Sequence, residues 1–302
     1  MQFVSGILYL TGAFILAGSS VVAARYVSGE LGVFTIAAVS LLLALLALLA
    51  VSGGRVLSAL HSMDRHKWIA ILLQAAFGMF LFRFFLLTGL RYTSTGEAGL
   101  LTGAAPAFTA LLAAAFLREP LYRTRILGII STVAGILLIQ GLFMDGSGLA
   151  SRHLFGNLLV LAAAMCESLF NVLSRFSNIK CSLNNNTELT PQVQAALVTG
   201  TAFILCLLPA LMERPAPALI SLSMFDWLAL LWYGVMVTAL GYILWYAGIK
   251  RCDAIVAAAF SGMMPFTSLC LSVALLGEHP SGPQWAGGAV VVLGMAFSGM
   301  KQ

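Results

Sequence analysis

The stretch that decides the fold is residues 90–138, which read LRYTSTGEAGLLTGAAPAFTALLAAAFLREPLYRTRILGIISTVAGILL. Shifted by 159 positions, it aligns without a gap with residues 249–297. Chance does not give such a run of matched glycine, proline and glutamate, so the chain contains an internal repeat. The matched pairs, with two just upstream, are Trp68 and Trp227, Gly89 and Gly248, Gly103 and Gly262, Pro106 and Pro265, Glu119 and Glu278, Gly128 and Gly287, and Gly135 and Gly294.

A second offset carries the repeat to the N-terminus. There a shift of 150 positions pairs Gly6 with Gly156 and Arg25 with Arg175, so the second copy holds nine extra residues around an Asn-rich segment. We therefore expect two structural units, residues 1–150 and residues 151–302.

The composition places these units in a membrane. Of 302 residues, 60% are hydrophobic and only 9% are charged, whereas a soluble domain carries about 25% charged residues. The net charge of +5 would suggest nucleic acid for a soluble protein. In a membrane protein the positions of Lys and Arg along the chain indicate its orientation instead. We therefore expect no nucleic-acid partner.

Ten apolar windows of spanning length follow one another along the chain. Because they lack the residue-by-residue alternation of barrel strands, we predict an all-α membrane protein with ten transmembrane helices. Five helices per half is an odd number, so the second half enters the membrane from the opposite side and the halves form an inverted repeat, typical of alternating-access transporters. The windows are residues 5–27, 32–52, 67–89, 94–117, 123–142, 155–176, 192–212, 225–248, 253–276 and 283–300.

The connections predict the orientation. With the N-terminus inside, eleven Lys and Arg residues fall in inner connections and only four, Arg25, Arg91, Arg152 and Arg214, in outer ones. This positive-inside bias predicts that both termini are cytoplasmic. We expect a multi-pass protein of the bacterial inner (plasma) membrane.

The repeated stretch and its counterpart resemble the drug/metabolite transporter superfamily, in its EamA-type branch. The resemblance rests on the paired proline, the Leu-x-Glu that ends the fourth and ninth helices, and the Gly-x6-Gly of the fifth and tenth, and it covers essentially the whole chain. It implies a ten-helix exporter of small metabolites. It also implies a central cavity lined by the first, third, fourth, sixth, eighth and ninth helices.

Glu167 is the most costly residue to bury. It lies about twelve residues into the 155–176 helix, roughly 18 Å along at 1.5 Å per residue, which is mid-membrane. A charge there costs roughly 2.5 to 3.5 kcal/mol on insertion scales, so we expect Glu167 to face a cavity, pair with a cation or hold a proton. Asn171 lies one turn later on the same face. The structural alternative is a protonated carboxyl that hydrogen-bonds a neighbouring helix.

Arg83 is the one Lys or Arg inside a window rather than near a helix end. We interpret it as a cation for a substrate carboxylate or a partner for Glu167, with snorkelling to the interface as the alternative. Gln74 faces a similar direction. Tyr242 needs a polar partner for its hydroxyl. With Trp245 and the small hydroxyls of Ser19 and Ser261, these residues complete the predicted substrate-binding set.

Pro106 and Pro265 lie near the middle of the 94–117 and 253–276 helices. A proline inside a helix removes a backbone hydrogen bond, so we predict a kink and a hinge at each, although a lone proline is more often a packing kink. The paired glycines, Gly128, Gly135, Gly287 and Gly294, predict close packing of the fifth helix on the tenth, away from the cavity.

Three acidic residues at helix ends are interpreted as structural. Ser94 and Glu97 fit a capping box at the start of the 94–117 helix. Glu119 and Glu278 end the fourth and ninth helices, where we expect them to brace their loops through donors such as Arg123, with gating as the less favoured alternative.

The predicted function is a secondary active transporter rather than an enzyme, because the sequence has no metal-ligand cluster and no phosphate-binding glycine loop. We expect no cofactor. We predict a monomer that exports a small polar or zwitterionic, amino-acid-like metabolite, with protons as a coupling ion. The alternatives are a lipid-intermediate flippase of the same fold and an intramembrane enzyme acting on lipid-linked substrates.

Overall fold

The computed structural model describes residues 2–117, 123–139, 151–183, 189–249, 251 and 263–299, and the described residues form helices with no strand among them. Among the described residues, seven helices are long and apolar enough to cross a membrane, and two shorter apolar helices accompany them, so the protein is a multi-pass membrane protein. The seven are Val4–Val27, Val33–Ser52, Arg65–Gly89, Thr95–Phe116, His153–Ser174, Pro191–Met212 and Met224–Ile249, and the shorter two are Ile126–Gly135 and Met263–Leu276.

The described residues of the first half form nine helical segments. The third predicted window is built from three of them, because a π-helical segment, η1, separates two α-helices. The segments are α1 (Gln2–Val27), α2 (Val33–Ser52), α3 (Arg55–Ser62), α4 (Arg65–Ala75), η1 (Ala76–Leu81), α5 (Phe82–Gly89), α6 (Thr95–Thr102), α7 (Ala105–Leu117) and α8 (Arg123–Ile139).

The second half follows a similar order. A π-helical segment, η2, again interrupts one long helix, between α12 and α13. The segments are α9 (Ser151–Leu183), α10 (Pro191–Met212), α11 (Pro215–Ser221), α12 (Met224–Leu231), η2 (Trp232–Leu240), α13 (Gly241–Ile249), α15 (Met263–Leu276) and α16 (Gly282–Gly299). The sequence analysis did not predict the two π-helical segments or the short helices α3 and α11.

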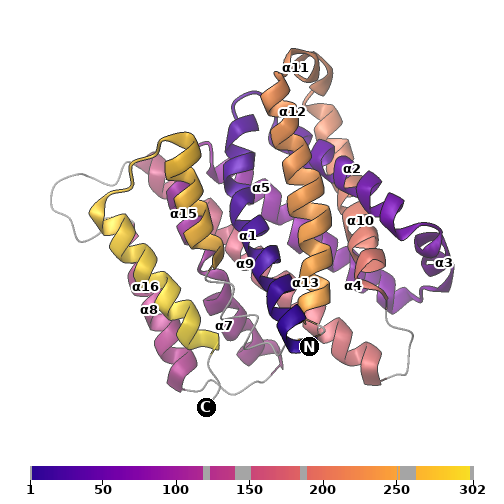
Figure 1. Ribbon diagram of the computed structural model, residues 1–302, viewed down its shortest axis with the longest axis horizontal. Coiled ribbons are helices and arrows are strands. Elements are labelled where there is room, and N and C mark those ends of the chain that lie inside the picture. Colours follow the sequence, from indigo (N-terminus) through magenta and orange to yellow (C-terminus); the bar gives the residue numbers. More distant parts are fainter. Residues whose placement is uncertain are drawn as a thin grey trace.

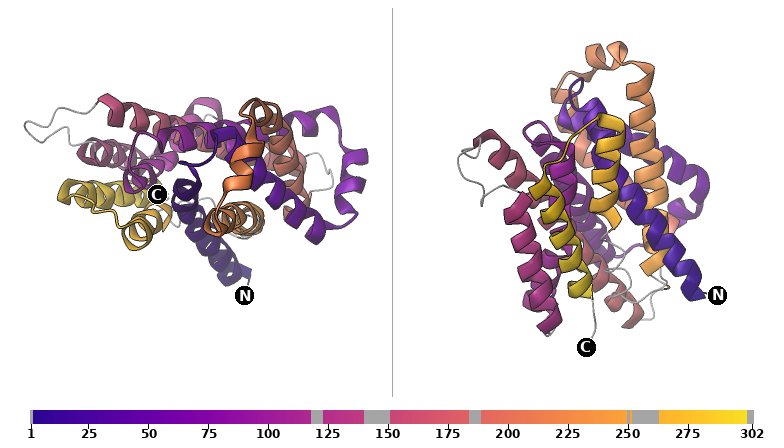
Figure 2. Two further views of the ribbon diagram at one scale, coloured as in Figure 1. Left: turned by 90° about the horizontal axis from the view of Figure 1, so that it is seen from above. Right: turned by 60° about the vertical axis from the view of Figure 1, so that its left-hand side comes forward.

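The helices pack into an elongated bundle in which α1 begins and α16 ends at the same end (Figure 1). At one edge α16 lies along α8, and the views of Figures 1 and 2 agree on this pairing. Toward the other edge α2 packs on α10, while α1 packs on both α13 and α15. The α9 helix packs against α5 and α7.

Apolar side chains cover the outside of the bundle as well as its core. Ile204 and Leu208 are each 69% exposed on α10, whereas Val198 and Ala202 of the same helix are fully buried. A helix that is apolar on both faces is stable where lipid replaces water. The buried face of α10 meets Leu41, Ala44 and Leu48 of α2 in the largest core cluster.

Close packing of α8 on α16 confirms the role predicted for the paired glycines. A Cβ on Gly135 would lie 2.7 Å from the carbonyl oxygen of Gly287. On the other side of the contact, a Cβ on Gly294 would lie 2.7 Å from the carbonyl oxygen of Gly128. Only glycine therefore lets these two backbones touch at both places.

The fourth predicted helix is broken rather than bent at its proline. The helix α6 ends at Thr102, and the amides of Gly103 and Ala104 bond the carbonyl oxygens three residues earlier, at 3.0 Å each. Pro106 is then the second residue of α7, within a first helical turn, where a missing N–H breaks no helix bond. The expected interruption exists, but it precedes the proline. Pro265 is the third residue of α15, and the residues before Met263 lie outside the described part of the chain.

Candidate functional site

Arg83 is buried between helices. The α5 helix carries it, and the side chain is 4% exposed. Its Nη1 donates to the hydroxyl of Ser40 on α2 and its Nη2 to the hydroxyl of Thr238 on η2, at 2.5 Å each. The guanidinium carbon also lies 4.2 Å from the centre of the Tyr233 ring, a cation–π contact. The snorkelling alternative is therefore wrong, because the head group is held inside the bundle.

The π-helical segment η2 shapes the site around Arg83. The Thr238 hydroxyl donates to the carbonyl oxygen of Tyr233, five residues earlier, at 2.8 Å. This bond leaves the oxygen lone pairs of Thr238 to accept from Arg83. A π-helical turn inside a helix is frequently found at a functional site, and here it aligns a hydroxyl and an aromatic face toward one cation.

Glu167 lies on α9, which packs against α5. Its Oε2 atom is buried and has no hydrogen-bond partner among the residues that the structure describes. No ion pair joins it to Arg83, so the pairing that the sequence suggested for these two residues is absent from the structure. Asn171 lies one turn further along α9 and is partly buried. An unpaired buried carboxylate oxygen costs free energy unless a proton or a ligand satisfies it.

Gln74 and Tyr242 lie in a polar and aromatic layer between α4, α10 and α13. The Oε1 atom of Gln74, on α4, accepts from the hydroxyl of Tyr246 at 3.2 Å and from the amide of Gln194 at 3.3 Å. The Tyr242 hydroxyl donates to the carbonyl oxygen of Gly78 at 3.1 Å, which supplies the polar partner that the sequence analysis required.

The layer reaches the helix that carries Glu167. The Tyr242 ring meets the Phe170 ring of α9 edge to face, with 5.8 Å between centroids. A Cβ on Gly78 would collide with that Phe170 ring, so the glycine allows η1 and α9 to approach closely. The structure thus brings Gln74, Tyr242 and the α9 segment around Glu167 together.

Trp245 and Ser19 both contact neighbouring helices, but they have different partners. The Trp245 indole packs edge to face on Phe14 of α1, and its Nε1 atom is buried without a hydrogen-bond partner. The Ser19 hydroxyl donates to the carbonyl oxygen of Leu16 and accepts from the indole of Trp232 at 2.9 Å. Ser19 therefore already links α1 to η2. Ser261 lies outside the described residues.

A cavity of about 460 Å³ opens at the end of the bundle opposite the start of α1. Its wall carries charges of both signs, contributed by the ends of α1, α6, α9, α15 and α16 and by the connections between them. The arginine, glutamate and histidine residues in the lining are Arg25, Arg91, Glu97, His153, Glu278 and His279. No site was predicted here from the sequence.

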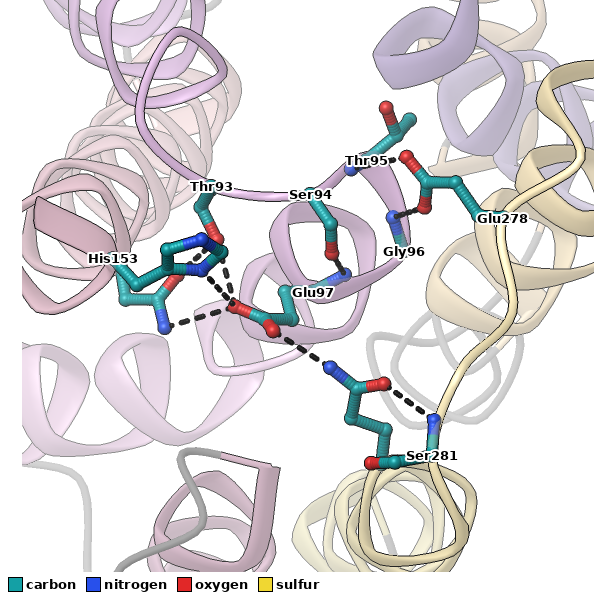
Figure 3. A network of polar contacts seen from close by, with 10 residues as sticks. Thr93, Ser94, Thr95, Gly96, Glu97, His153, Glu278 and Ser281 are labelled. Atoms are coloured by element: carbon teal, nitrogen blue, oxygen red, sulfur yellow. Dashed lines mark hydrogen bonds and ion pairs between the residues drawn. The ribbon is translucent and has the colours of Figure 1, made fainter. Parts of the chain in front are cut away.

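Glu97 is the centre of a polar network beside this cavity (Figure 3). Its carboxylate accepts from the Thr93 hydroxyl at 2.8 Å, from Asn157 of α9 at 3.2 Å and from Gln284 of α16 at 2.6 Å. The Nδ1 atom of His153 is 3.8 Å away. Ser94 does cap α6, accepting the Glu97 amide at 3.1 Å. The second half of the predicted capping box is wrong, because the carboxylate instead joins three helices.

Glu278 does not brace its own loop as predicted. Its carboxylate accepts the backbone amides of Thr95 at 2.9 Å and Gly96 at 2.8 Å, at the start of α6 (Figure 3). The positive end of the α6 dipole faces this carboxylate, which is favourable. Glu119 lies outside the described residues.

Sequence reasoning missed the neutral partners of Arg83 and the network around Glu97. Ser40, Thr238 and Asn157 are single polar residues in apolar windows, and nothing local distinguishes them from hydroxyls or amides that serve only in packing. A signal was available at Gln284, because it lies in the first turn of the predicted 283–300 helix, whereas His153 lies just before the predicted 155–176 helix. Even so, only the packing of α9 and α16 on α6 brings them to Glu97.

Spanning helices that enclose a guanidinium and a carboxylate are typical of proteins that move polar solutes, because such groups are costly in lipid. The sequence profile of the EamA-like transporter family matches residues 4–141 and again residues 154–300. The chain belongs to this family, and the resemblance seen in the repeated stretch is confirmed.

Relatives of known name are transporters and exporters. The "Uncharacterized transporter YetK" of Bacillus subtilis is 29% identical over 97% of this chain and 86% of its own length. The "Probable amino-acid metabolite efflux pump" of Salmonella typhimurium is 29% identical over 74% of this chain and 73% of its own. The "Aromatic amino acid exporter YddG" of Ancylobacter novellus is 26% identical over 73% of this chain and 72% of its own.

A solved crystal structure shares the fold. It superimposes with a TM-score of 0.63 over 97% of this chain and 96% of its own, at 23% identity. This likeness concerns the fold alone.

Proposed function

We propose that the protein exports a small zwitterionic, amino-acid-like metabolite across the bacterial inner membrane by alternating access. The observation that carries the proposal is two unmatched charged groups inside the bundle, Arg83 on α5 and Glu167 on α9. Within the described part of the chain, Arg83 has only neutral partners, and Glu167 has an oxygen with none. A substrate with a carboxylate and an ammonium group could complete both. Three relatives named above are transporters, and two of their names specify amino acids or their metabolites.

The architecture proposed is ten transmembrane helices in two inverted units, residues 1–150 and 151–302. The order of segments supports it: a shift of 159 positions carries the α4–η1–α5 segment, residues 65–89, onto residues 224–248 of α12–η2–α13. The same shift carries α3, residues 55–62, onto residues 214–221, which include α11. Two matches to one family profile also support a repeat.

The contacts between helices also support two related units. In the first half α1 packs on α13 and α15, and in the second half α9 packs on α5 and α7. By the repeat, α9 corresponds to α1, α5 to α13, and α7 to α15, so each contact has its counterpart. Alternating access follows if each unit adopts in turn the conformation of the other.

The proposed binding set is Arg83, Glu167, Asn171, Gln74, Tyr242 and Trp245, with Ser19 and Ser261 adding hydroxyls and Pro106 and Pro265 marking hinges. Glu167 is proposed as the site that exchanges a proton for substrate. Its unpartnered oxygen supports this role, because a proton or a substrate ammonium would satisfy the same atom. The orientation proposed keeps both termini cytoplasmic, and the positive-inside count supports it. The working unit is proposed to be the monomer.

Transport by purified protein in proteoliposomes tests the proposal. A thermal-shift screen over amino acids, nucleosides and sugars first identifies compounds that stabilise the protein. Labelled forms of these compounds are then followed across the vesicle membrane with and without a pH gradient. We expect zwitterionic amino acids to be both stabilising and transported. The proposal would be overturned if lipid-linked substrates were the only compounds that stabilised the protein and were transported by it.

A further inference from the structure

The helices α6 and α15 meet through small residues beside the cavity. A Cβ on Gly96 would lie 3.2 Å from the Ser272 hydroxyl oxygen, and a Cβ on Gly99 would collide with Ser268. The two helices therefore touch with no space for a side chain between them. Gly96, Leu100 and Leu269 also line the cavity, so this contact forms part of the cavity wall.

A carboxylate joins the two helices where α15 ends and α6 begins. After α15 ends at Leu276, Gly277 adopts a positive φ of 64°, and the chain turns back toward α6. Each oxygen of Glu278 then accepts one amide of α6, from Thr95 and from Gly96. We call these two hydrogen bonds to Glu278 the clasp. Hydrogen bonds to a charged acceptor are stronger than those between neutral groups, so the clasp helps to hold α6 against α15.

The closed contact leaves two hydroxyls unpaired. The Oγ1 atom of Thr95 and the Oγ atom of Ser268 are buried, and no described residue forms a hydrogen bond with either. If α6 and α15 separated, water could reach both hydroxyls. The closed contact therefore costs free energy, which the clasp offsets. At the contact of α8 with α16, by comparison, the Thr132 hydroxyl donates to the Gly128 carbonyl oxygen at 2.9 Å.

A second carboxylate makes a similar clasp elsewhere, and there the threonine hydroxyl beside the clasp is paired. Glu213, at the end of α10, accepts the amides of Phe34 and Thr35 at the start of α2. There the Thr35 hydroxyl also donates to the carboxylate, at 2.7 Å. At the two clasps, the Thr35 hydroxyl is thus paired, whereas the Thr95 hydroxyl has no partner among the described residues.

We infer that Glu278 is a positioning residue for transport, whose carboxylate latches α6 onto α15 and closes the translocation path at the cavity end of the bundle. It acts through α6 and touches no substrate. Release of the two amides of Thr95 and Gly96 accompanies opening. The inference rests on the proposed alternating access, which supplies the second conformation.

Thiol accessibility tests the latch without a transport assay. In a background lacking the five native cysteines, Ser272→Cys places a thiol in the closed contact, and a water-soluble maleimide reports its exposure on purified protein. We expect Glu278→Gln to raise the labelling rate about tenfold, as loss of one charge-assisted hydrogen bond would. The matched control, Glu213→Gln, removes the same kind of carboxylate from the α2–α10 contact and should leave the rate unchanged.

A second variant covers the case in which Glu278→Gln lowers folded yield. Gly99→Ala adds a methyl group that collides with Ser268, so it should also raise labelling at Ser272→Cys. A labelling rate unchanged by both Glu278→Gln and Gly99→Ala would overturn the latch. So would equal acceleration by Glu213→Gln, because that result indicates general loosening of the bundle.

Cross-linking then connects the latch to transport. The pair Gly96→Cys and Ser272→Cys is close enough for a disulfide, because a Cβ at residue 96 already lies 3.2 Å from the residue 272 hydroxyl oxygen. We expect oxidation to stop export and reductant to restore it. Export at full rate by the oxidised pair would contradict the latch. If no substrate is transported by any form, the proposed function fails, while the labelling result still decides whether Glu278 holds the contact closed.

Discussion

The Nη2 atom of Arg83 lies 2.5 Å from the hydroxyl oxygen of Thr238, on a helix 155 residues away in sequence. This bond and the one to Ser40 connect α5 to both α2 and η2. A guanidinium held by neutral oxygens keeps its full charge available to an anion, because hydroxyls do not neutralise it.

The first prediction concerns this charge. Arg83→Ala should weaken transport of substrates that bear a carboxylate by about tenfold or more, the effect of losing a charge-assisted hydrogen bond, and affect those without one much less. The measurement is KM for an amino acid and for its decarboxylated amine in proteoliposomes. Arg123→Ala, which removes an exposed guanidinium from the start of α8, is the control. If the transport of both substrates fell equally, Arg83 would have a purely structural role.

The second prediction concerns Glu167. Glu167→Gln replaces the carboxyl with a neutral group of the same size, so the variant should behave at every pH as the wild type does with Glu167 protonated. We expect it to fold normally and to lose the pH dependence of export, as measured in proteoliposomes across a pH series. Asp226→Asn, on an exposed helix cap, should keep that dependence. A wild-type pH profile in Glu167→Gln would exclude Glu167 as the coupling carboxylate.

The third prediction concerns the break between α6 and α7. Pro106 breaks no helix bond in the first turn of α7, but Pro106→Ala adds an N–H that could bond the Thr102 carbonyl oxygen and let one helix continue through the break. The exchange between conformations should slow more than substrate binding weakens, so kcat falls while KM changes little. Pro209→Ala, within α10, removes a proline from another helix and should leave kcat intact. Parallel losses in kcat and affinity would argue against a hinge.

The fourth prediction concerns the α8–α16 contact. Gly135→Ala pushes a methyl group to 2.7 Å from the Gly287 carbonyl oxygen, which should cost about 1 to 3 kcal/mol of stability, and Gly135→Leu should cost more. Gly200→Ala is the matched control, since its Cβ would meet Leu45 at an ordinary 3.5 Å. Thermal unfolding in detergent measures both. Stable Gly135→Leu protein that no longer transports would show that this contact has a transport role instead.

Much of the fold was predictable because it depends on local composition. The apolar windows and the glycine pairs are properties of neighbouring residues, and the α8–α16 contact confirmed the use predicted for Gly135 and Gly294. The π-helical segments were not predictable, because the change from i−4 to i−5 bonding depends on how η1 and η2 pack between other helices.

The sequence by itself determined that this chain is a helical membrane protein with a repeated unit, because hydrophobicity, periodicity and matched residues are written along the chain. Only the tertiary structure decided which groups meet. Glu278 reaches Thr95 across 183 positions, and Arg83 finds Thr238 rather than Glu167. The physical reason is that a buried polar group is satisfied by whichever donor or acceptor packing brings within hydrogen-bond distance, and that distance is set by helices far apart in sequence.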